Sequence, residues 1–224
     1  MEKIKDIDKT TEKKLRLFAR LLGEANKFAR VIGPSDEKTI YAEHVTDALA
    51  ALPLLEKFAG VGFVDVGTGG GLPGIAWGIC RPDLRGVLVD SVSKKIKIAR
   101  EIAAALGLKN IETVNARSED LARKSREKFE IATARAVSNA RILAEYLSPL
   151  VKVGGIIVAF KGPGIHKELD VTPALWRSLG LASPRMEPYG AAGKNLYLVI
   201  WEKISPCPAK YPRSPGEAKK NPLS

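Results

Sequence analysis

The feature that most constrains the fold of this 224-residue chain is a glycine-rich segment, residues 65–74, between a strand-like run and a helix. It reads Asp-Val-Gly-Thr-Gly-Gly-Gly-Leu-Pro-Gly and overlaps the end of an apolar run at 61–66. Glycines at such a turn allow tight backbone bends and let a ligand touch the main chain. A strand, a glycine loop and a helix in this order predict the first unit of an α/β sheet.

Short apolar runs alternate with helical stretches from residue 61 onward, which is typical of a parallel sheet covered by helices. Amphipathic spacing predicts helices at 93–106 and near 168–179. We therefore expect a doubly wound, seven-stranded and mostly parallel α/β sheet, closed by an antiparallel hairpin. Its predicted strands are 61–66, 86–90, 111–115, 129–134, 155–160, 183–189 and 195–202.

Two further segments flank this predicted sheet domain at 61–203. Before it, residues 10–30 have apolar side chains at helical spacing, and a second helical stretch begins near residue 35 or 36. They predict a small N-terminal helical unit at 1–60. After the sheet domain, residues 204–224 hold five prolines without periodicity, so we expect a basic proline-rich tail that is extended or disordered in isolation.

The chain carries 36 Lys and Arg against 25 Asp and Glu, a formal charge of +11. The excess is +1 in 1–60, +7 in 61–200 and +3 in 201–224. Such an excess fits a polyanionic partner, and equally a basic surface that only aids solubility. Two cysteines exclude a disulfide framework and a structural zinc site. With so few cysteines we expect a reducing, cytoplasmic compartment and no metal site. No apolar run reaches the roughly 18 residues of a membrane span, so we expect no membrane partner.

The glycine loop suits two classes of cofactor. Its spacing Gly69-x-Gly71-x-x-Gly74, with Asp90 at the end of the next strand, matches a nicotinamide dinucleotide site. Asp65 argues against that interpretation, because its carboxylate would repel a pyrophosphate and would favour a cationic amino-acid group. S-adenosylmethionine has such a group, together with a sulfonium and no phosphate. The residues favour S-adenosylmethionine, and an NAD-dependent oxidoreductase stays open as the alternative.

Other candidate site residues follow the later strands, where open α/β sheets bind their ligands. Asp90 could accept hydrogen bonds from ribose hydroxyls or cap the next helix. Ser118 and Glu119 could flank an adenine, while Glu119 could equally be a first-turn carboxylate of a helix. Arg135 follows the fourth strand and Lys161 the fifth. Arg135 could clamp an anion or form a surface ion pair, and Lys161 places a second cation on the same edge.

The residues after the fourth strand and the positions of the cysteines narrow the methyl acceptor. Methylation of base amino groups commonly uses Asn or Asp before Pro-Pro and an aromatic residue, but this place holds Ala134-Arg135-Ala136. Pyrimidine C5 methylation needs a cysteine nucleophile, and neither Cys80 nor Cys207 follows a suitable strand. An acceptor that is already nucleophilic, such as guanine N7, needs neither a base nor a covalent step. For such an acceptor we expect no catalytic acid, base or nucleophile, and catalysis by positioning.

These motifs resemble those of the bacterial 16S ribosomal RNA guanine-N7 methyltransferases, the glucose-inhibited division protein B family. The likeness is carried by residues 65–75 with their Gly-Leu-Pro-Gly extension, Asp90-Ser91 before Lys94-Lys95, Arg117-Ser-Glu119, Ala134-Arg135-Ala136 and Lys161-Gly162. His44-Val-Thr-Asp47 resembles a helix motif of the family, and Tyr211-Pro-Arg213 resembles the basic tail of some members. The chain departs from the pattern at Arg30-Val31-Ile32 and at Ala48.

The resemblance implies a Rossmann-like methyltransferase fold that methylates N7 of one guanine in the decoding-region loop of 16S rRNA. Its cofactor would be S-adenosylmethionine, released as S-adenosylhomocysteine, and its partner 16S rRNA or the small-subunit particle. We expect a monomer, and a non-catalytic ribosome-assembly factor stays open as a second alternative. The implied cofactor contacts come from Gly67, Leu72, Asp90, Ser91, Val92, Ser118, Glu119 and Arg135, to which the loop argument adds Asp65 and Gly69.

RNA contacts are expected from His44, Arg135, Lys161 and Arg213, although His44 could instead be a structural residue that ties the helical unit to the cleft. Because the charge excess includes the tail, we expect residues 204–224 to contribute to RNA affinity and to leave cofactor affinity little changed.

Overall fold

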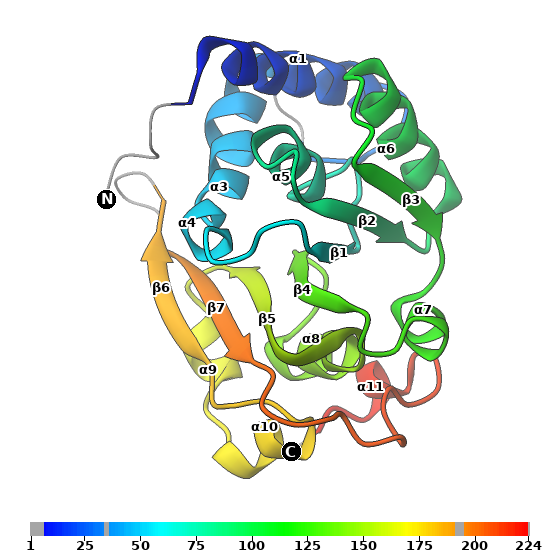
Figure 1. Ribbon diagram of the computed structural model, residues 1–224, viewed down its shortest axis with the longest axis vertical. Helices are drawn as coiled ribbons and strands as arrows, with labels where there is room; N and C mark the ends of the chain where they lie inside the picture. Colours follow the sequence, from blue (N-terminus) through cyan, green and yellow to red (C-terminus); the bar gives the residue numbers. More distant parts are fainter. Residues whose placement is uncertain (1–6, 34–35, 191–194, 224) are drawn as a thin grey trace.

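A seven-stranded sheet is the centre of the computed structural model, which describes residues 7–33, 36–190 and 195–223. Its strand order is β3-β2-β1-β4-β5-β7-β6, in which β1 to β5 run parallel and β7 is antiparallel to β5 and β6 (Figure 1). The strand order reverses between β1 and β4, which is where doubly wound sheets bind their ligands. The predicted fold class is confirmed.

The strands lie close to the predicted ranges. They are β1 Gly62–Val66, β2 Arg85–Asp90, β3 Ile111–Asn115, β4 Phe129–Arg135, β5 Val151–Lys161, β6 Arg185–Tyr189 and β7 Leu196–Glu202. The largest difference is in β5, which starts at Val151 and not at residue 155. Its pairing with β4 is irregular between Phe129 and Ile131, and two glycines at 154 and 155 interrupt the apolar run that marks the strand in the sequence.

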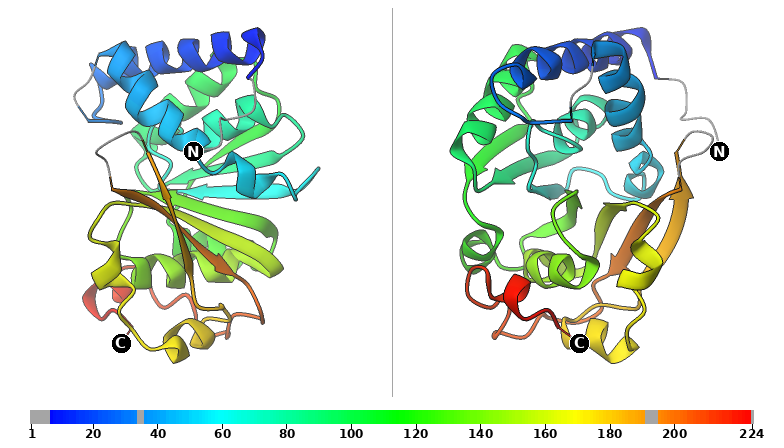
Figure 2. Two further views of the ribbon diagram at one scale, coloured as in Figure 1. Left: turned by 90° about the vertical axis from the view of Figure 1, so that its left-hand side faces the viewer. Right: turned by 180° about the vertical axis from the view of Figure 1, so that it is seen from behind.

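Helices cover both faces of the sheet (Figure 2). Neighbouring strand residues such as Phe63 and Val64 belong to different hydrophobic clusters, because successive side chains of a strand point to opposite faces. One cluster lies under α1 Lys9–Asn26, α3 Thr46–Leu49, α5 Gly74–Cys80 and α6 Ser93–Ala105. The other includes residues of α7 Ser118–Lys124, α8 Ala140–Leu147, α9 Ile165–Glu168 and α10 Pro173–Ser178. Among the described residues, no helix is long and apolar enough to span a membrane.

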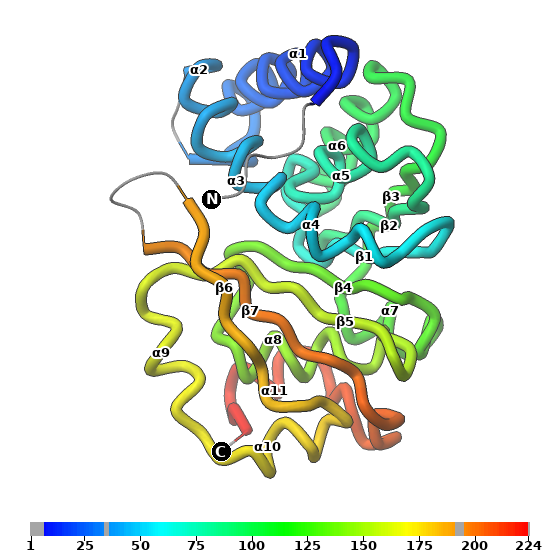
Figure 3. The backbone as a smooth tube through the Cα atoms, turned by 60° about the vertical axis from the view of Figure 1, so that its left-hand side comes forward, coloured from blue at the N-terminus to red at the C-terminus, as the bar shows by residue number. Residues whose placement is uncertain are grey.

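The N-terminal helices pack on one side of the sheet domain, with α1 across α5 and α6 (Figure 3). The second predicted helix is broken into α2 Glu37–Ile40, a π-helical turn η1 Tyr41–Val45, α3, and α4 Leu52–Leu55. The indole nitrogen of Trp77 in α5 donates to the carbonyl oxygen of Ala48 at 2.8 Å. Since these helices share one hydrophobic cluster with the sheet, a unit boundary at residue 60 stays a prediction about chain organisation.

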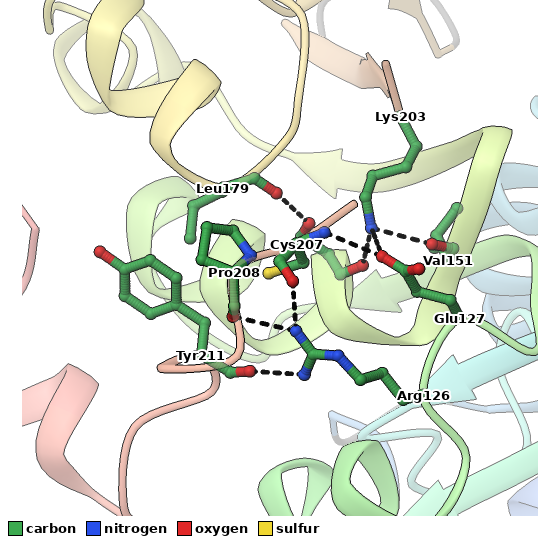
Figure 4. A network of polar contacts seen from close by, with 9 residues as sticks. Arg126, Glu127, Val151, Leu179, Lys203, Cys207, Pro208 and Tyr211 are labelled. Carbon is green, nitrogen blue, oxygen red and sulfur yellow. Dashed lines mark hydrogen bonds and ion pairs between the residues drawn. The ribbon is translucent and has the colours of Figure 1, made fainter. Parts of the chain in front are cut away.

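The C-terminal tail is packed against the domain. The sequence predicts a tail that is extended or disordered in isolation, and in the folded chain residues 204–216 form no helix or strand but are held by contacts with the domain. The guanidinium group of Arg126 donates to the backbone carbonyl oxygens of Tyr211 at 2.7 Å, Pro208 at 2.9 Å, and Cys207 (Figure 4). The side chains of Cys207 and Tyr211 are buried in the cluster that contains α8. The tail ends in a short helix, α11 Glu217–Lys220, which contacts α8.

Two buried ion pairs fix the path of this tail. The Lys203 ammonium group, at its start, is fully buried and lies 3.0 Å from Oε1 of Glu127 (Figure 4). Burial lowers the pKa of Lys203, and the hydrogen bond with Glu127 opposes this change. Further along, Arg213 binds the buried carboxylate of Glu145 through Nε at 2.9 Å and Nη2 at 2.6 Å. A buried charge without its partner is costly, so each pair holds the chain in place.

We predict that Arg213→Ala lowers the free energy of unfolding by about 3 kcal/mol or more, because it leaves the buried Glu145 carboxylate without its counter-charge. Arg123→Ala is the matched control, since Arg123 pairs with Asp120 between two half-exposed side chains and should contribute less than about 1 kcal/mol. Urea unfolding followed by circular dichroism measures both changes. Equal losses in the two variants would contradict an anchoring role for Arg213.

Candidate functional site

The Asp65 carboxylate lies buried at the end of β1 and organises the glycine loop. Its Oδ2 atom accepts hydrogen bonds from the Thr68 hydroxyl at 2.7 Å and from the backbone N–H of Gly74 at 2.9 Å. These contacts close the loop over the carboxylate and fix the start of α5. The Oδ1 atom is buried and has no hydrogen-bond partner within the described part of the chain.

Burial raises the pKa of Asp65 to about 6, because the charged form loses its hydration. The hydrogen bonds from Thr68 and Gly74 and the positive charge of Arg135 lower the pKa, while the negative charge of Asp90 raises it further. Asp65 therefore lies under the loop as a carboxylate that supports it. Direct contact between Asp65 and a cofactor stays a prediction.

Gly67 follows β1 at a point where a side chain does not fit. Its φ is +72°, and a Cβ atom there would lie 2.5 Å from Cγ2 of Val137. The Gly67 N–H donates to the carbonyl oxygen of Val89 at 2.7 Å, and the Gly69 N–H donates to Oδ2 of Asp90 at 3.1 Å. The loop is thus tied to the end of the neighbouring strand β2 with its backbone close to the edge of the sheet.

A pocket opens beside this loop at the carboxyl ends of β1, β2 and β3. Five of the predicted cofactor residues line it: Gly67, Asp90, Ser91, Ser118 and Glu119. Each oxygen of the Asp90 carboxylate accepts one backbone N–H, Oδ2 from Gly69 and Oδ1 from Val92 at 2.9 Å. A carboxylate oxygen has two lone pairs, so each keeps one for a ligand.

The other five predicted cofactor residues lie around the pocket and outside its lining: Asp65, Gly69, Leu72, Val92 and Arg135. Leu72 is buried in the hydrophobic cluster with α5, whereas Val92 is exposed. The cofactor contacts predicted for this second group stay predictions.

The pocket also has walls that the sequence did not predict. Its lining includes Val137, after β4, and Tyr146, on α8, as well as Gly216 and Lys219 of the tail. The Gly216 N–H donates to Oε1 of Glu119 at 3.1 Å. No periodicity or motif marks these tail residues in the sequence, so only the folded chain reveals their position.

Similar sequences identify the protein family. A family model described as "GidB: rRNA small subunit methyltransferase G" matches residues 11–197. The chain belongs to the GidB family. It is 37% identical over 214 residues to "Ribosomal RNA small subunit methyltransferase G" of Clostridium perfringens, covering 94% of this chain and 90% of that protein. The protein of the same name from Fervidobacterium nodosum is 39% identical over 176 residues, covering 78% and 82% of the two chains.

Solved structures support the fold of this GidB family member. The antibiotic-resistance methyltransferase Kmr superimposes with a TM-score of 0.53 at 20% identity, covering 69% of this chain and 93% of that one. An rRNA methylase from Streptococcus thermophilus superimposes with a TM-score of 0.52 at 15% identity, covering 70% and 95%. The family resemblance and the expected Rossmann-like methyltransferase fold are both confirmed.

Arg135 and His44 meet where β4 ends beside the N-terminal helices of this GidB chain. Nη1 of Arg135 donates to the His44 carbonyl oxygen at 3.2 Å, and Nη2 lies 3.4 Å from Nδ1 of the imidazole. Burial lowers the pKa of Arg135, whereas the negative charge of Asp47 raises it. A guanidinium group stays protonated even so, and a partly buried cation remains near the edge of the sheet. The structure therefore joins two of the predicted RNA-binding residues.

The other two residues predicted to bind RNA have intramolecular partners. Nζ of Lys161 lies 2.8 Å from Oε2 of Glu168, and the Lys161 side chain is only 10% exposed. Arg213 is held by Glu145. Each ion pair would have to open before its cation could bind a phosphate group directly, so RNA binding by Lys161 and Arg213 stays a prediction.

We predict that Asp65→Asn changes how stability depends on pH. The pKa of about 6 lies above the ordinary value of 3.8, so between these values the folded state keeps a proton that the unfolded state has lost. The free energy of unfolding therefore falls as pH rises through this window, by roughly 3 kcal/mol from this group. Below the window both states are protonated, and above it both are ionised.

Urea unfolding from about pH 3 to about pH 8 measures this effect as the difference between wild type and variant. The wild-type chain should lose more stability than Asp65→Asn across the window. Asp120→Asn, at a half-exposed carboxylate on α7, should keep the wild-type pH profile. If Asp65→Asn also keeps that profile, the carboxylate is not destabilised by burial.

Proposed function

We propose that this GidB family member transfers a methyl group from S-adenosylmethionine to N7 of one guanine in the decoding-region loop of 16S rRNA. The observation that carries the choice of cofactor is the hydrogen bond from the Gly74 N–H to Asp65. In dinucleotide-binding sheets the pyrophosphate lies at the start of this helix. Here a carboxylate already accepts the first N–H of α5. A pyrophosphate would meet negative charge at that position, which argues against NAD.

The pocket residues fit an adenosyl ligand. Asp90 can accept hydrogen bonds from ribose hydroxyls through its remaining lone pairs, and Gly67 lets a ligand approach the backbone at the sheet edge. Ser118 and Glu119 supply further polar groups to the pocket lining. When bound, S-adenosylmethionine supplies a methyl group on a cationic sulfur. The chain's own task is to hold the ligand and the acceptor base in line.

A base that is already nucleophilic is the acceptor most compatible with these residues. Burial raises the pKa of the Cys80 thiol to about 11, and burial also raises the pKa of the Cys207 thiol in the tail. Neither side chain therefore favours the thiolate that pyrimidine C5 methylation needs. Guanine N7 needs neither a thiolate nor a base, which supports its assignment as the acceptor.

RNA binding in this proposal uses the cations at the carboxyl edge of the sheet. Arg135 lies there beside His44, and Lys161, at the end of β5, becomes available when its ion pair opens. Arg213, in the tail, would add a further cation once its ion pair with Glu145 opens. The excess charge of +7 in residues 61–200 supports binding to phosphate groups. The proposal includes 16S rRNA or the small-subunit particle as substrate, a cytoplasmic location and a monomeric enzyme.

The proposed reaction leaves a chemical mark that can be read directly. Treatment of 16S rRNA with borohydride and aniline cleaves at 7-methylguanosine, and primer extension locates the break. We expect one stop in the decoding-region loop in cells with the gene, and none in cells without it. Complementation with Asp120→Ala should restore the stop, whereas Asp90→Ala, which removes a pocket carboxylate, should not. An identical pattern with and without the gene would exclude N7 methylation and favour a non-catalytic assembly factor.

We predict that Gly67→Ala weakens the binding of S-adenosylhomocysteine by at least about tenfold. The new Cβ atom would contact Cγ2 of Val137 at 2.5 Å in a backbone conformation that alanine disfavours. Calorimetric titration measures the affinity, and Gly107→Ala is the control. Gly107 also has positive φ, +67°, but no atom lies within 4 Å of its added Cβ.

The double variant Gly67→Ala with Val137→Ala separates the two causes. It removes the steric contact and leaves the backbone strain, so we expect partial recovery of affinity. Wild-type affinity in Gly67→Ala itself would show that the loop backbone at this position does not approach the ligand.

A further inference from the structure

Part of the tail forms one wall of the pocket. We call residues 207–220 the C-terminal strap. Its residues Gly216 and Lys219 line the same pocket as Asp90, Ser118 and Glu119. Figure 1 shows α11, at the red end of the chain, next to α7 and α8. Residues more than 90 positions apart in the sequence, Glu119 and Gly216, are thus in direct contact.

Glu119 is the polar link between the strap and the pocket. The carboxylate is buried, with 4% of the residue exposed, at the start of α7. Its Oε1 atom accepts the Gly216 N–H at 3.1 Å, and its Oε2 atom accepts the Ser118 hydroxyl at 3.0 Å. The same side chain therefore lines the pocket and holds the strap, and a movement of the strap alters the partners of Glu119.

A small hydrophobic cluster makes a second link. Ala218 of the strap packs with Ile142 and Tyr146 of α8, and the Tyr146 side chain also lines the pocket. Burial raises the pKa of the Tyr146 hydroxyl, and the neighbouring carboxylates of Glu119 and Glu145 raise it further, so it stays neutral. The strap therefore packs against the Tyr146 side chain, which lines the pocket.

The first half of the strap is anchored independently of the pocket. Arg126 binds the carbonyl oxygens of residues 207, 208 and 211, and Glu145 binds Arg213. By contrast, residues 214–220 make their polar contact with the domain through Glu119 alone among the hydrogen bonds and ion pairs found for the described residues. Beyond the strap, Nη1 of Arg141 donates to the Leu223 carbonyl oxygen at 3.3 Å, so residues 214–220 form a segment that is held at both ends. Loss of the Glu119 contact would let this segment move away from the pocket while residues 207–213 stay in place.

We infer that the C-terminal strap is part of the cofactor site, and that strap docking and binding of the adenosyl ligand stabilise each other. The inference rests on the proposed function, because it takes S-adenosylmethionine as the occupant of the pocket. A ligand that contacts Ser118, Glu119 and Tyr146 touches the groups that hold residues 216–219. Two events that share contacts are linked, and each changes the equilibrium of the other by the same factor. This inference and the sequence-based expectation, that the tail leaves cofactor affinity little changed, make opposite predictions for removal of the strap.

Calorimetric titration of S-adenosylhomocysteine into the wild-type chain and three variants tests whether the strap is part of the cofactor site. A chain ending at Arg213 keeps both anchors and loses residues 214–224, and we expect at least about tenfold weaker binding. Lys219→Glu reverses a charge in the pocket wall, and we expect a loss of at least about fivefold. Lys220→Glu makes the same change at the next residue of α11, which is exposed and outside the pocket lining, and should bind within about twofold of wild type.

Limited proteolysis of the wild-type chain tests the linkage without any measure of activity. Trypsin cleavage after Lys219 and Lys220, followed by mass spectrometry, reports the population of the open strap when closing is fast. Saturating S-adenosylhomocysteine should slow cleavage there by about the factor that truncation costs in affinity. Cleavage after Arg123 on α7, which carries an exposed side chain, is the internal control and should change less.

The possible outcomes distinguish failure of the strap inference from failure of the proposed function. If wild-type chain does not bind S-adenosylhomocysteine, the proposed function itself fails. If wild type binds, and Lys219→Glu and Lys220→Glu bind equally well while the ligand gives no protection, the strap is not part of the site. The two lysine variants carry this conclusion even if the truncated chain does not fold, because both changes are on the surface.

Discussion

The hydrogen bonds that the buried Asp65 carboxylate accepts from Thr68 and Gly74 determine the shape of the site. They hold the loop after β1 in a closed turn and set the first residue of α5. The same loop reaches Asp90 through the Gly69 N–H, so the position of one carboxylate depends on that of the other. The arrangement is costly, since burial raises the pKa of Asp65 and one of its oxygen atoms is left without a partner among the described residues. A chain would keep such a group where loop geometry matters more than stability.

Local patterns predicted the sheet well, because each strand is a short apolar run bounded by turn residues. The same reasoning missed the start of β5, where two glycines interrupt the run, and the π-helical turn that divides the second helix. It also predicted a tail that is extended or disordered in isolation, and did not predict the contacts that hold it in the folded chain. The tail has no periodicity to detect, and its order comes from Arg126, Glu145 and Glu119, which lie 68 to 97 residues away in the sequence.

Some residues of the candidate site could likewise be predicted from the sequence, and others could not. Asp90, Ser118 and Glu119 could be predicted from their places after strands, because parallel strands bring their carboxyl ends to one edge. Tyr146, Gly216 and Lys219 could not, since α8 and the tail reach that edge only through tertiary packing. The ion-pair partners of the predicted RNA-binding cations were harder still to predict. In the sequence Lys161 and Arg213 look like free positive charges, and only the fold shows the carboxylates of Glu168 and Glu145 beside them.

The contact between Arg126 and the tail reflects the numbers of backbone hydrogen-bond donors and acceptors in a proline-rich segment. Each proline removes a backbone N–H and leaves its carbonyl oxygen, so a segment with five prolines offers more acceptors than donors. Three carbonyl oxygens of this segment meet one guanidinium group, which carries five N–H donors and no acceptor. A lysine has fewer donors and no fixed fork to direct them. A proline-rich segment therefore docks best on arginine, and its composition already selects the kind of side chain that can hold it.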